Sequence, residues 1–285
     1  MSGGTPWHDA AREVAAAAGW RETVRRMARL RWTVVFDPPR DGAANMAVDH
    51  ALAETVEPDA GWLRLYRWVR PTLSLGRNEP AADIYDFARA RRRGIDVVRR
   101  PTGGRGVLHD AELTYAVVVP VARARRLRAA YAAVHAGLAV GLRSLGAEAR
   151  LAAGVAPGRP RAGACFDATA GGEVVAGGRK LTGSAQARIG RALLQHGSVL
   201  IDGTQDVVGV LCRRPAVAGT PPASTTLREQ LGRAPSWSEV ATAALEGLAA
   251  ELGTDMAEGE LPRRAMRRIR SLERHYRSRE WTLRL

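Results

Sequence analysis

The sequence predicts an α+β protein with mixed β-sheets flanked by helices. Short segments rich in apolar and β-branched residues are typical of strands, and they occur at 32–36, 62–68, 72–77 and 192–201. One long helix is expected at 123–145, because this stretch is rich in Ala and Leu and ends at Gly146. Beyond Pro222 the pattern becomes helical, with helices expected at 224–231, 236–252 and 261–276.

The remaining elements follow in chain order. A helix opens at Asn45 and continues through about Glu57, and the turn at Pro71 separates the second and third strands. An apolar strand beginning at Ile95 runs into a glycine-rich loop and continues as a strand at 113–119. A short strand is predicted at 147–153, a Pro- and Gly-rich loop at 154–164, and a helix at 204–211.

The chain is predicted to form one domain, 27–285, with a helical C-terminal flank from about 224. No internal repeat or long linker divides it. Residues 1–26 alternate Ala with charged residues and are predicted to be an N-terminal extension, either non-native or disordered. Met27 stands just before the first predicted strand, so the natural start is expected there.

Composition excludes several classes of protein. The net charge is +14, but the arginines are spread along the chain and aromatic residues are only 5%, so we expect no nucleic-acid partner. A basic surface would instead attract small acidic carrier proteins. Two distant cysteines argue against a disulfide framework or a zinc site. With no run of 18 apolar residues and no signal peptide, we expect a cytoplasmic protein without a membrane partner.

The most informative stretch is 165–198, which holds the only lysine of the chain beside 42 arginines. Residues 173–186 predict a hairpin whose turn is Gly177-Gly178, so Lys180 lies just past the turn. The hairpin can fold back toward Cys165, where an ammonium would stabilise a nucleophilic thiolate. Two simpler readings stay open: the lone Lys is compositional noise, and Cys165 is a small buried hydrophobe.

A second glycine-rich stretch, 95–110, joins two strands without a following helix. A phosphate-binding loop and a dinucleotide fingerprint both need strand–glycine–helix order, so both are excluded. Glycines in such a loop allow close approach of the backbone to a ligand. The small residues Gly183 and Ser184 allow the same approach on the hairpin side.

Several motifs together resemble the biotin/lipoate protein ligase and transferase family. They are Cys165-Phe166, GRKLTGSAQ at 178–186, LQHGS at 194–198, RRPTGGRG at 99–106 with His109-Asp110, and Asn45-Met-Ala-Val-Asp49. The Cys-Phe pair followed by the lysine is similar to the cysteine-dependent octanoyltransferases of that family. The resemblance covers roughly residues 30–285 and implies the fold of the class II synthetase-like ligases and transferases.

The resemblance also implies site residues and a reaction. Catalysis would use Cys165, as a thioester-forming nucleophile, and Lys180, which lowers the pKa of its thiol. Substrate-binding candidates are Arg77, Arg100, Thr102, Gly103, Gly104, His109, Gly183 and Ser184. We expect Gly103, Gly104 and Gly183 to floor the acyl pocket. His196 is either a second general base or a structural residue hydrogen-bonded within the sheet.

The reaction implied is transfer of an octanoyl group from acyl carrier protein to a lysine of a lipoyl domain or of the glycine cleavage H protein, with neither metal nor cofactor. Three alternatives remain open. The first is an amidotransferase acting between lipoyl domains, and the second is an ATP-dependent lipoate ligase in which Cys165 is incidental. The third is a non-catalytic basic binding protein.

Overall fold

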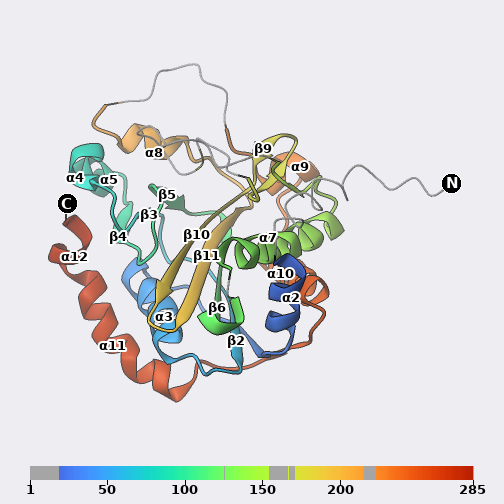
Figure 1. Cartoon of the computed structure of the whole chain (residues 1–285). Coiled ribbons are helices and arrows are strands. Elements are labelled where there is room, and N and C mark those ends of the chain that lie inside the picture. Colours follow the sequence, from blue (N-terminus) through green and yellow to red (C-terminus); the bar gives the residue numbers. More distant parts are fainter. Residues whose placement is uncertain (1–18, 125, 154–165, 167–170, 215–222, 285) are drawn as a thin grey trace.

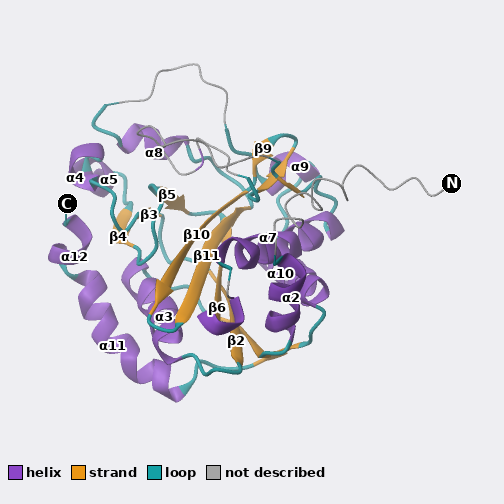
Figure 2. Ribbon diagram, viewed as in Figure 1, coloured by secondary structure: helices purple, strands orange, loops and turns teal. Residues whose placement is uncertain are grey.

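A six-stranded mixed sheet lies between two layers of helices in the computed structural model (Figure 1 and Figure 2). The structure describes residues 19–124, 126–153, 166, 171–214 and 223–284. Two smaller sheets of three strands each adjoin the large sheet. The α+β class with mixed sheets and flanking helices, predicted from the sequence, is confirmed.

The large sheet is antiparallel in one half and parallel in the other. Its order is β10 (Thr182–Ile189), β11 (Ala192–Leu200), β6 (Glu112–Pro120), β2 (Ala60–Tyr66), β1 (Arg31–Phe36) and β12 (Met256–Glu258). Strands β10, β11, β6 and β2 pair antiparallel, whereas β2, β1 and β12 run parallel. The register opposite β6 is continuous from Ala192↔Pro120 to Leu200↔Glu112.

Strand β6 divides the core into two halves because successive side chains of a strand point to opposite faces. Leu113, Tyr115 and Val117 belong to the core under one helical layer, and Ala116 and Val118 belong to the other. All nine residues of β6 are buried. A strand covered on both faces reads as a continuous apolar run, as this one does.

Each face of the sheet has its own helices. One face is covered by α2 (Trp20–Ala28), α6 (Val121–Ala124), α7 (Leu127–Ser144) and α10 (Trp237–Leu252), and the other by α3 (Gly42–Thr55) and α11 (Arg263–Arg277). The backbones of α7 and α10 pack directly against each other at Gly141. A Cβ at this position would lie 1.9 Å from the Ala243 carbonyl oxygen, so no side chain fits there. Ser236 and Glu239 form a capping box that begins α10.

The small sheets carry the loops that shape the site. The first is β4 (Asp96–Arg99), β3 (Thr72–Leu75) and β5 (Val107–His109), flanked by α4 (Ala81–Ile84), α5 (Phe87–Arg92) and α8 (Asp206–Leu211). The second is β7 (Arg150–Leu151), β8 (Val174–Ala176) and β9 (Arg179–Lys180). Helices α9 (Leu227–Leu231) and α12 (Arg279–Leu283) complete the chain.

Three details of the fold were not anticipated from the sequence. The expected boundary at residue 26 falls inside α2, whose residues Trp20, Thr23, Val24 and Met27 form an i, i+3, i+4, i+7 stripe toward the core. The C-terminal flank is not wholly helical, because β12 extends the large sheet. The strands before and after the turn at Pro71, β2 and β3, belong to different sheets. No helix in the described part of the chain is long and apolar enough to cross a membrane.

Candidate active site

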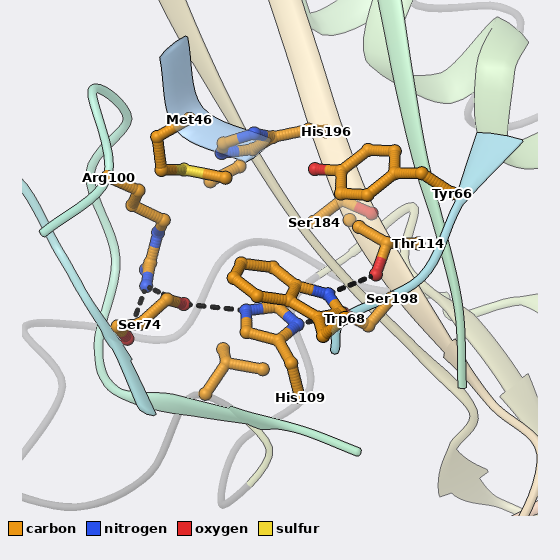
Figure 3. Close-up of a pocket in the computed structure, with 14 residues that line it drawn as sticks. Met46, Tyr66, Trp68, Ser74, Arg100, His109, Thr114, Ser184, His196 and Ser198 are labelled. Carbon is orange, nitrogen blue, oxygen red and sulfur yellow. Dashed lines mark hydrogen bonds between the residues drawn. The ribbon is translucent and has the colours of Figure 1, made fainter. Parts of the chain in front are cut away.

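A pocket opens where β10 and β11 of the large sheet meet the β3–β4–β5 sheet. Figure 3 shows side chains from both sheets converging on it. The empty space in the pocket, open mouth included, is about 370 Å³. Its walls are formed by Met46, Tyr66, Trp68, Ser74, Arg100, Val107, His109, Thr114, Gly183, Ser184, Ala185, His196, Gly197 and Ser198. Among the described residues no three His, Cys, Asp or Glu side chains are grouped to hold a metal ion.

Four of the eight predicted substrate-binding residues line this pocket: Arg100, His109, Gly183 and Ser184. Arg100 is buried, and its guanidinium donates to the Ser74 and Gly103 carbonyls and to Ser74 Oγ. The side chain therefore holds the glycine-rich loop as well as forming part of the wall. A Cβ on Gly183 would lie 2.7 Å from the Phe166 ring, so glycine is required for this contact.

The other four predicted residues, Arg77, Thr102, Gly103 and Gly104, do not line the pocket. Gly103 and Gly104 are exposed, so of the three expected floor glycines only Gly183 contributes. Gly104 has φ 95°, and its carbonyl oxygen would lie 1.8 Å from a Cβ on Gly76. Glycine at 76 and 104 therefore allows the two loops to pack closely against each other. Gly103 and Gly104, which the sequence predicted to floor the acyl site, therefore lie outside the walls of this pocket.

Arg77 and Thr102 support the loop instead. Arg77 is exposed, and its backbone N–H donates to the Thr102 carbonyl at 2.8 Å. Thr102 is fully buried, and its Oγ1 lies 2.7 Å from Nε2 of His196. His196 in turn places Nδ1 2.9 Å from Asp49 Oδ2. A carboxylate only accepts, so Nδ1 of His196 donates and Nε2 accepts from Thr102.

His196 is therefore engaged at both ring nitrogens, which favours the structural alternative over a general base. Burial lowers the pKa of its imidazole, against the raising effect of the Asp49 carboxylate. The Thr102–His196–Asp49 chain links the glycine-rich loop, β11 and α3.

His109 is similarly fixed. Its Nδ1 lies 2.6 Å from Glu112 Oε1, its Nε2 lies 2.7 Å from Ser74 Oγ, and its ring stacks on Trp68 with centroids 4.1 Å apart. Glu112 Oε1 also accepts from Ser198 Oγ at 2.8 Å. Trp68 and His109 thus both line the pocket, while the ring nitrogens of both are hydrogen-bonded within the protein (Figure 3).

The predicted hairpin that carries Lys180 is present as β8 and β9. Its turn glycines Gly177 and Gly178 both have positive φ, 55° and 78°, as the two-residue turn requires. Lys180 is 1% exposed, its Nζ donates to Glu173 Oε1 at 2.7 Å, and it lies 5.2 Å from the centroid of the Phe166 ring. Cys165 lies outside the described residues. Its neighbour in sequence, Phe166, packs with Val107 and Leu200 at the pocket.

Sequence reasoning missed Glu173, although a signal existed. Val175 pairs with Lys180 across the hairpin, and Glu173 is two residues away on the same face. It also missed His135, on α7, which gives no local signal. His135 is fully buried, its Nδ1 lies 2.6 Å from the Gly172 carbonyl oxygen and its Nε2 lies 2.8 Å from Ser184 Oγ.

The buried His135 predicts how stability changes with pH. Burial lowers the pKa of its imidazole to about 4, from an ordinary value near 6.5. Between about pH 6.5 and 4, His135 is therefore protonated in the unfolded chain but not in the folded chain. The free energy of unfolding should fall as the pH drops through this interval. Protonation of His135 should lower the free energy of unfolding by roughly 3 kcal/mol across that interval. Urea unfolding at several pH values should show a shallower decline for His135→Gln than for the wild type. Parallel pH dependences would contradict the assignment.

Comparison with known proteins identifies the family of this chain. The chain belongs to the lipoyl protein ligase A/B catalytic domain family, whose model matches residues 41–249. It is 37% identical over 270 residues to octanoyltransferase LipM of Kyrpidia tusciae, covering 89% of this chain and 98% of that protein. Octanoyltransferase LipM of Symbiobacterium thermophilum is 36% identical over 276 residues, again covering 89% and 98%.

Solved structures share the fold at lower sequence identity. A bi-partite lipoate protein ligase of Thermoplasma acidophilum has a TM-score of 0.73 at 22% identity, covering 89% of this chain and 96% of that one. A lipoate-protein ligase A bound with ATP has a TM-score of 0.71 at 22% identity, covering 89% and 99%. These likenesses confirm the predicted ligase and transferase fold.

Proposed function

We propose that this chain is an octanoyltransferase of lipoate biosynthesis. The proposal is carried by its similarity over nearly the whole length to octanoyltransferases LipM of two bacteria. We further propose that the donor is octanoyl acyl carrier protein. The acceptor is a lysine of a lipoyl domain or of the glycine cleavage H protein. The basic net charge of +14 suits acidic carrier proteins as partners.

The reaction proceeds in two steps through Cys165. In the first step the Cys165 thiolate attacks the carbonyl carbon of the donor thioester, and the carrier thiolate leaves as the new C–S bond forms. In the second step the acceptor amine attacks the same carbon, an amide forms, and the C–S bond to Cys165 breaks. The proton lost by the amine passes to the departing Cys165 sulfur. Division into two steps lets two protein substrates use one pocket in turn.

Lys180 is the cation that stabilises the Cys165 thiolate. A buried ammonium acts strongly on a neighbouring anion because little water screens it. Lys180 is 1% exposed and lies beside the ring of Phe166, the residue that follows Cys165. Glu173 holds the ammonium through its 2.7 Å contact, and so keeps Nζ from turning away.

The acyl chain occupies the pocket. Its ligand-facing surface includes Met46, Val107 and the rings of Tyr66 and Trp68. The polar groups of the wall bond one another, as His109 does with Glu112 and Ser74. Apolar surface of this kind favours an unsubstituted alkyl chain through the hydrophobic effect.

The test is a covalent adduct formed without acceptor or ATP. Incubation of the whole chain with octanoyl acyl carrier protein alone should add one octanoyl group to the peptide that contains Cys165, as read by mass spectrometry. Addition of an acceptor lipoyl domain should remove the adduct and modify that domain. Cys165→Ala should give no adduct at that peptide. Absence of the adduct from the wild type, or acceptor modification only when ATP is supplied, would overturn the proposal in favour of a ligase.

A further inference from the structure

A hydrogen-bond chain of fixed direction crosses the wall of the pocket at Ser184. The Gly172 carbonyl can only accept, so Nδ1 of His135 must donate to it over their 2.6 Å contact. A neutral imidazole carries one proton, so Nε2 accepts the hydrogen of Ser184 Oγ at 2.8 Å. The low pKa of His135, about 4 because of burial, keeps the ring neutral near neutral pH.

The same logic fixes the other side of Ser184. Its single hydrogen is given to His135, so Tyr115 must donate its hydroxyl hydrogen to Ser184 Oγ at 2.6 Å. Gln195 Nε2 in turn donates to the Tyr115 oxygen at 3.1 Å. The Ser184 hydroxyl oxygen has two lone pairs, and one of them accepts the hydrogen of Tyr115. Ser184 is half-buried and lines the pocket, so it offers a ligand one lone pair and no hydrogen.

Ser184 also lies next to a residue that contacts Phe166, which follows the proposed nucleophile Cys165 in the chain. Gly183, directly before it, touches the Phe166 ring, and Phe166 follows Cys165 in sequence. The charge of Lys180 acts on His135, the partner of Ser184. The remaining lone pair of Ser184 Oγ would repel a carbonyl oxygen or an oxyanion of a ligand. It can instead accept a hydrogen bond from a ligand atom that carries hydrogen.

We infer that Ser184, oriented by His135, accepts a hydrogen bond from the amine of the incoming lysine in the second step. This inference rests on the proposed function. The donor thioester offers no hydrogen at its reacting atoms, whereas the attacking amine has two N–H groups and becomes positively charged as the C–N bond forms. A hydrogen bond from a charged donor is about twice as strong as one between neutral groups, so the contact strengthens in the transition state. Ser184 is thereby a specificity element for amines as acyl acceptors, and His135 is a positioning residue.

The experiment separates the two steps. Adduct formation at Cys165 is followed with octanoyl acyl carrier protein alone, and discharge is followed by mixing the isolated acyl-enzyme with a lipoyl domain. Ser184→Ala should form the adduct within about 3-fold of the wild-type rate and discharge it about 10- to 100-fold more slowly. The substitution should lower the discharge rate at saturating acceptor and leave the half-saturating concentration of acceptor little changed.

Three further variants complete the test. His135→Phe removes the acceptor that orients the Ser184 hydroxyl and should slow discharge in the same way. His135→Gln can donate to Gly172 and accept from Ser184, and should restore much of the rate. Thr182→Val is the matched control, because the Thr182 hydroxyl on the same strand is buried and has no hydrogen-bond partner among the residues that the structure describes. It should change neither step.

The outcomes distinguish this inference from the proposed function. Discharge of Ser184→Ala at the wild-type rate would overturn the inference and leave the transferase standing. Equal slowing of both steps would also overturn it, since Ser184 would then serve donor binding or folding. An adduct absent from the wild type would overturn the proposed function itself, and this inference with it.

Discussion

Replacement of Arg64 with methionine is expected to lower the free energy of unfolding by about 3–5 kcal/mol, because it removes the buried cation that pairs with Asp37 and Asp49. Asp37 would keep its ion pair with the half-exposed Arg40. Arg64 is fully buried on β2. Its Nη2 donates to Asp37 Oδ2 at 2.6 Å and to Asn45 Oδ1 at 2.7 Å, and its Nη1 donates to Asp49 Oδ1 at 2.7 Å. Urea denaturation followed by circular dichroism measures the loss.

Arg31, on the neighbouring strand β1, provides the matched control. It also pairs with two carboxylates, Glu57 and Asp59, but its side chain is 68% exposed. Solvent screens such pairs and holds the ions at little cost, so Arg31→Met should leave the unfolding midpoint nearly unchanged. A similar loss in both variants would show that burial is not what makes Arg64 important.

The Arg64 cluster also reaches the pocket. Asp49, one of its partners, accepts from His196 at 2.9 Å, and His196 lines the pocket. The hydroxyl of Tyr66, also in the wall, donates to the same oxygen, Asp49 Oδ2, at 2.9 Å. The wall of the pocket is therefore built on a buried charge cluster. If the acyl chain occupies this pocket as proposed, loss of Arg64 should weaken acylation at Cys165 even in molecules that remain folded.

Local patterns gave the sequence-based predictions that agree with the structure. Short apolar and β-branched segments predicted the strands. The Gly177-Gly178 pair predicted the hairpin, because a two-residue turn with positive φ is a property of those residues alone. The family motifs identified four residues that line the pocket: Arg100, His109, Gly183 and Ser184. Each of these residues lies on or beside a strand whose position the pattern defines.

Contacts between distant segments could not be predicted in the same way. Arg64 and Asp37 are separated by 27 residues, and His135 and Ser184 by 49. Nothing in the local sequence marks a helix residue such as His135 as the partner of a strand hydroxyl, since only the packing of α7 on the sheet brings them together. Strand β12 has three residues with no buried member, so periodicity could not reveal it.

Replacement of Lys180 should have the largest effect on catalysis. If its ammonium stabilises the Cys165 thiolate, Lys180→Ala should raise the pKa of the thiol toward its ordinary value of about 8.5. The thiolate is the reactive form, so acylation should be at least about 10-fold slower at pH 7 and should recover partly above pH 8.5. Lys180→Arg should also be impaired, because a planar guanidinium cannot occupy the site of a compact ammonium held 2.7 Å from Glu173.

The measurement is the rate of iodoacetamide alkylation at Cys165 from pH 5 to 10 in the wild type, Lys180→Ala and Lys180→Arg. Arg179→Ala is the control, because Arg179 is the adjacent cation but pairs with Glu229 on the more exposed side of the hairpin. Its profile should coincide with that of the wild type. In Lys180→Ala the rising limb should move to higher pH, since a thiol without a neighbouring cation needs more alkaline conditions to ionise. Superimposable profiles for Lys180→Ala and the wild type would assign Lys180 to substrate binding, because the residue would then have no influence on this thiol.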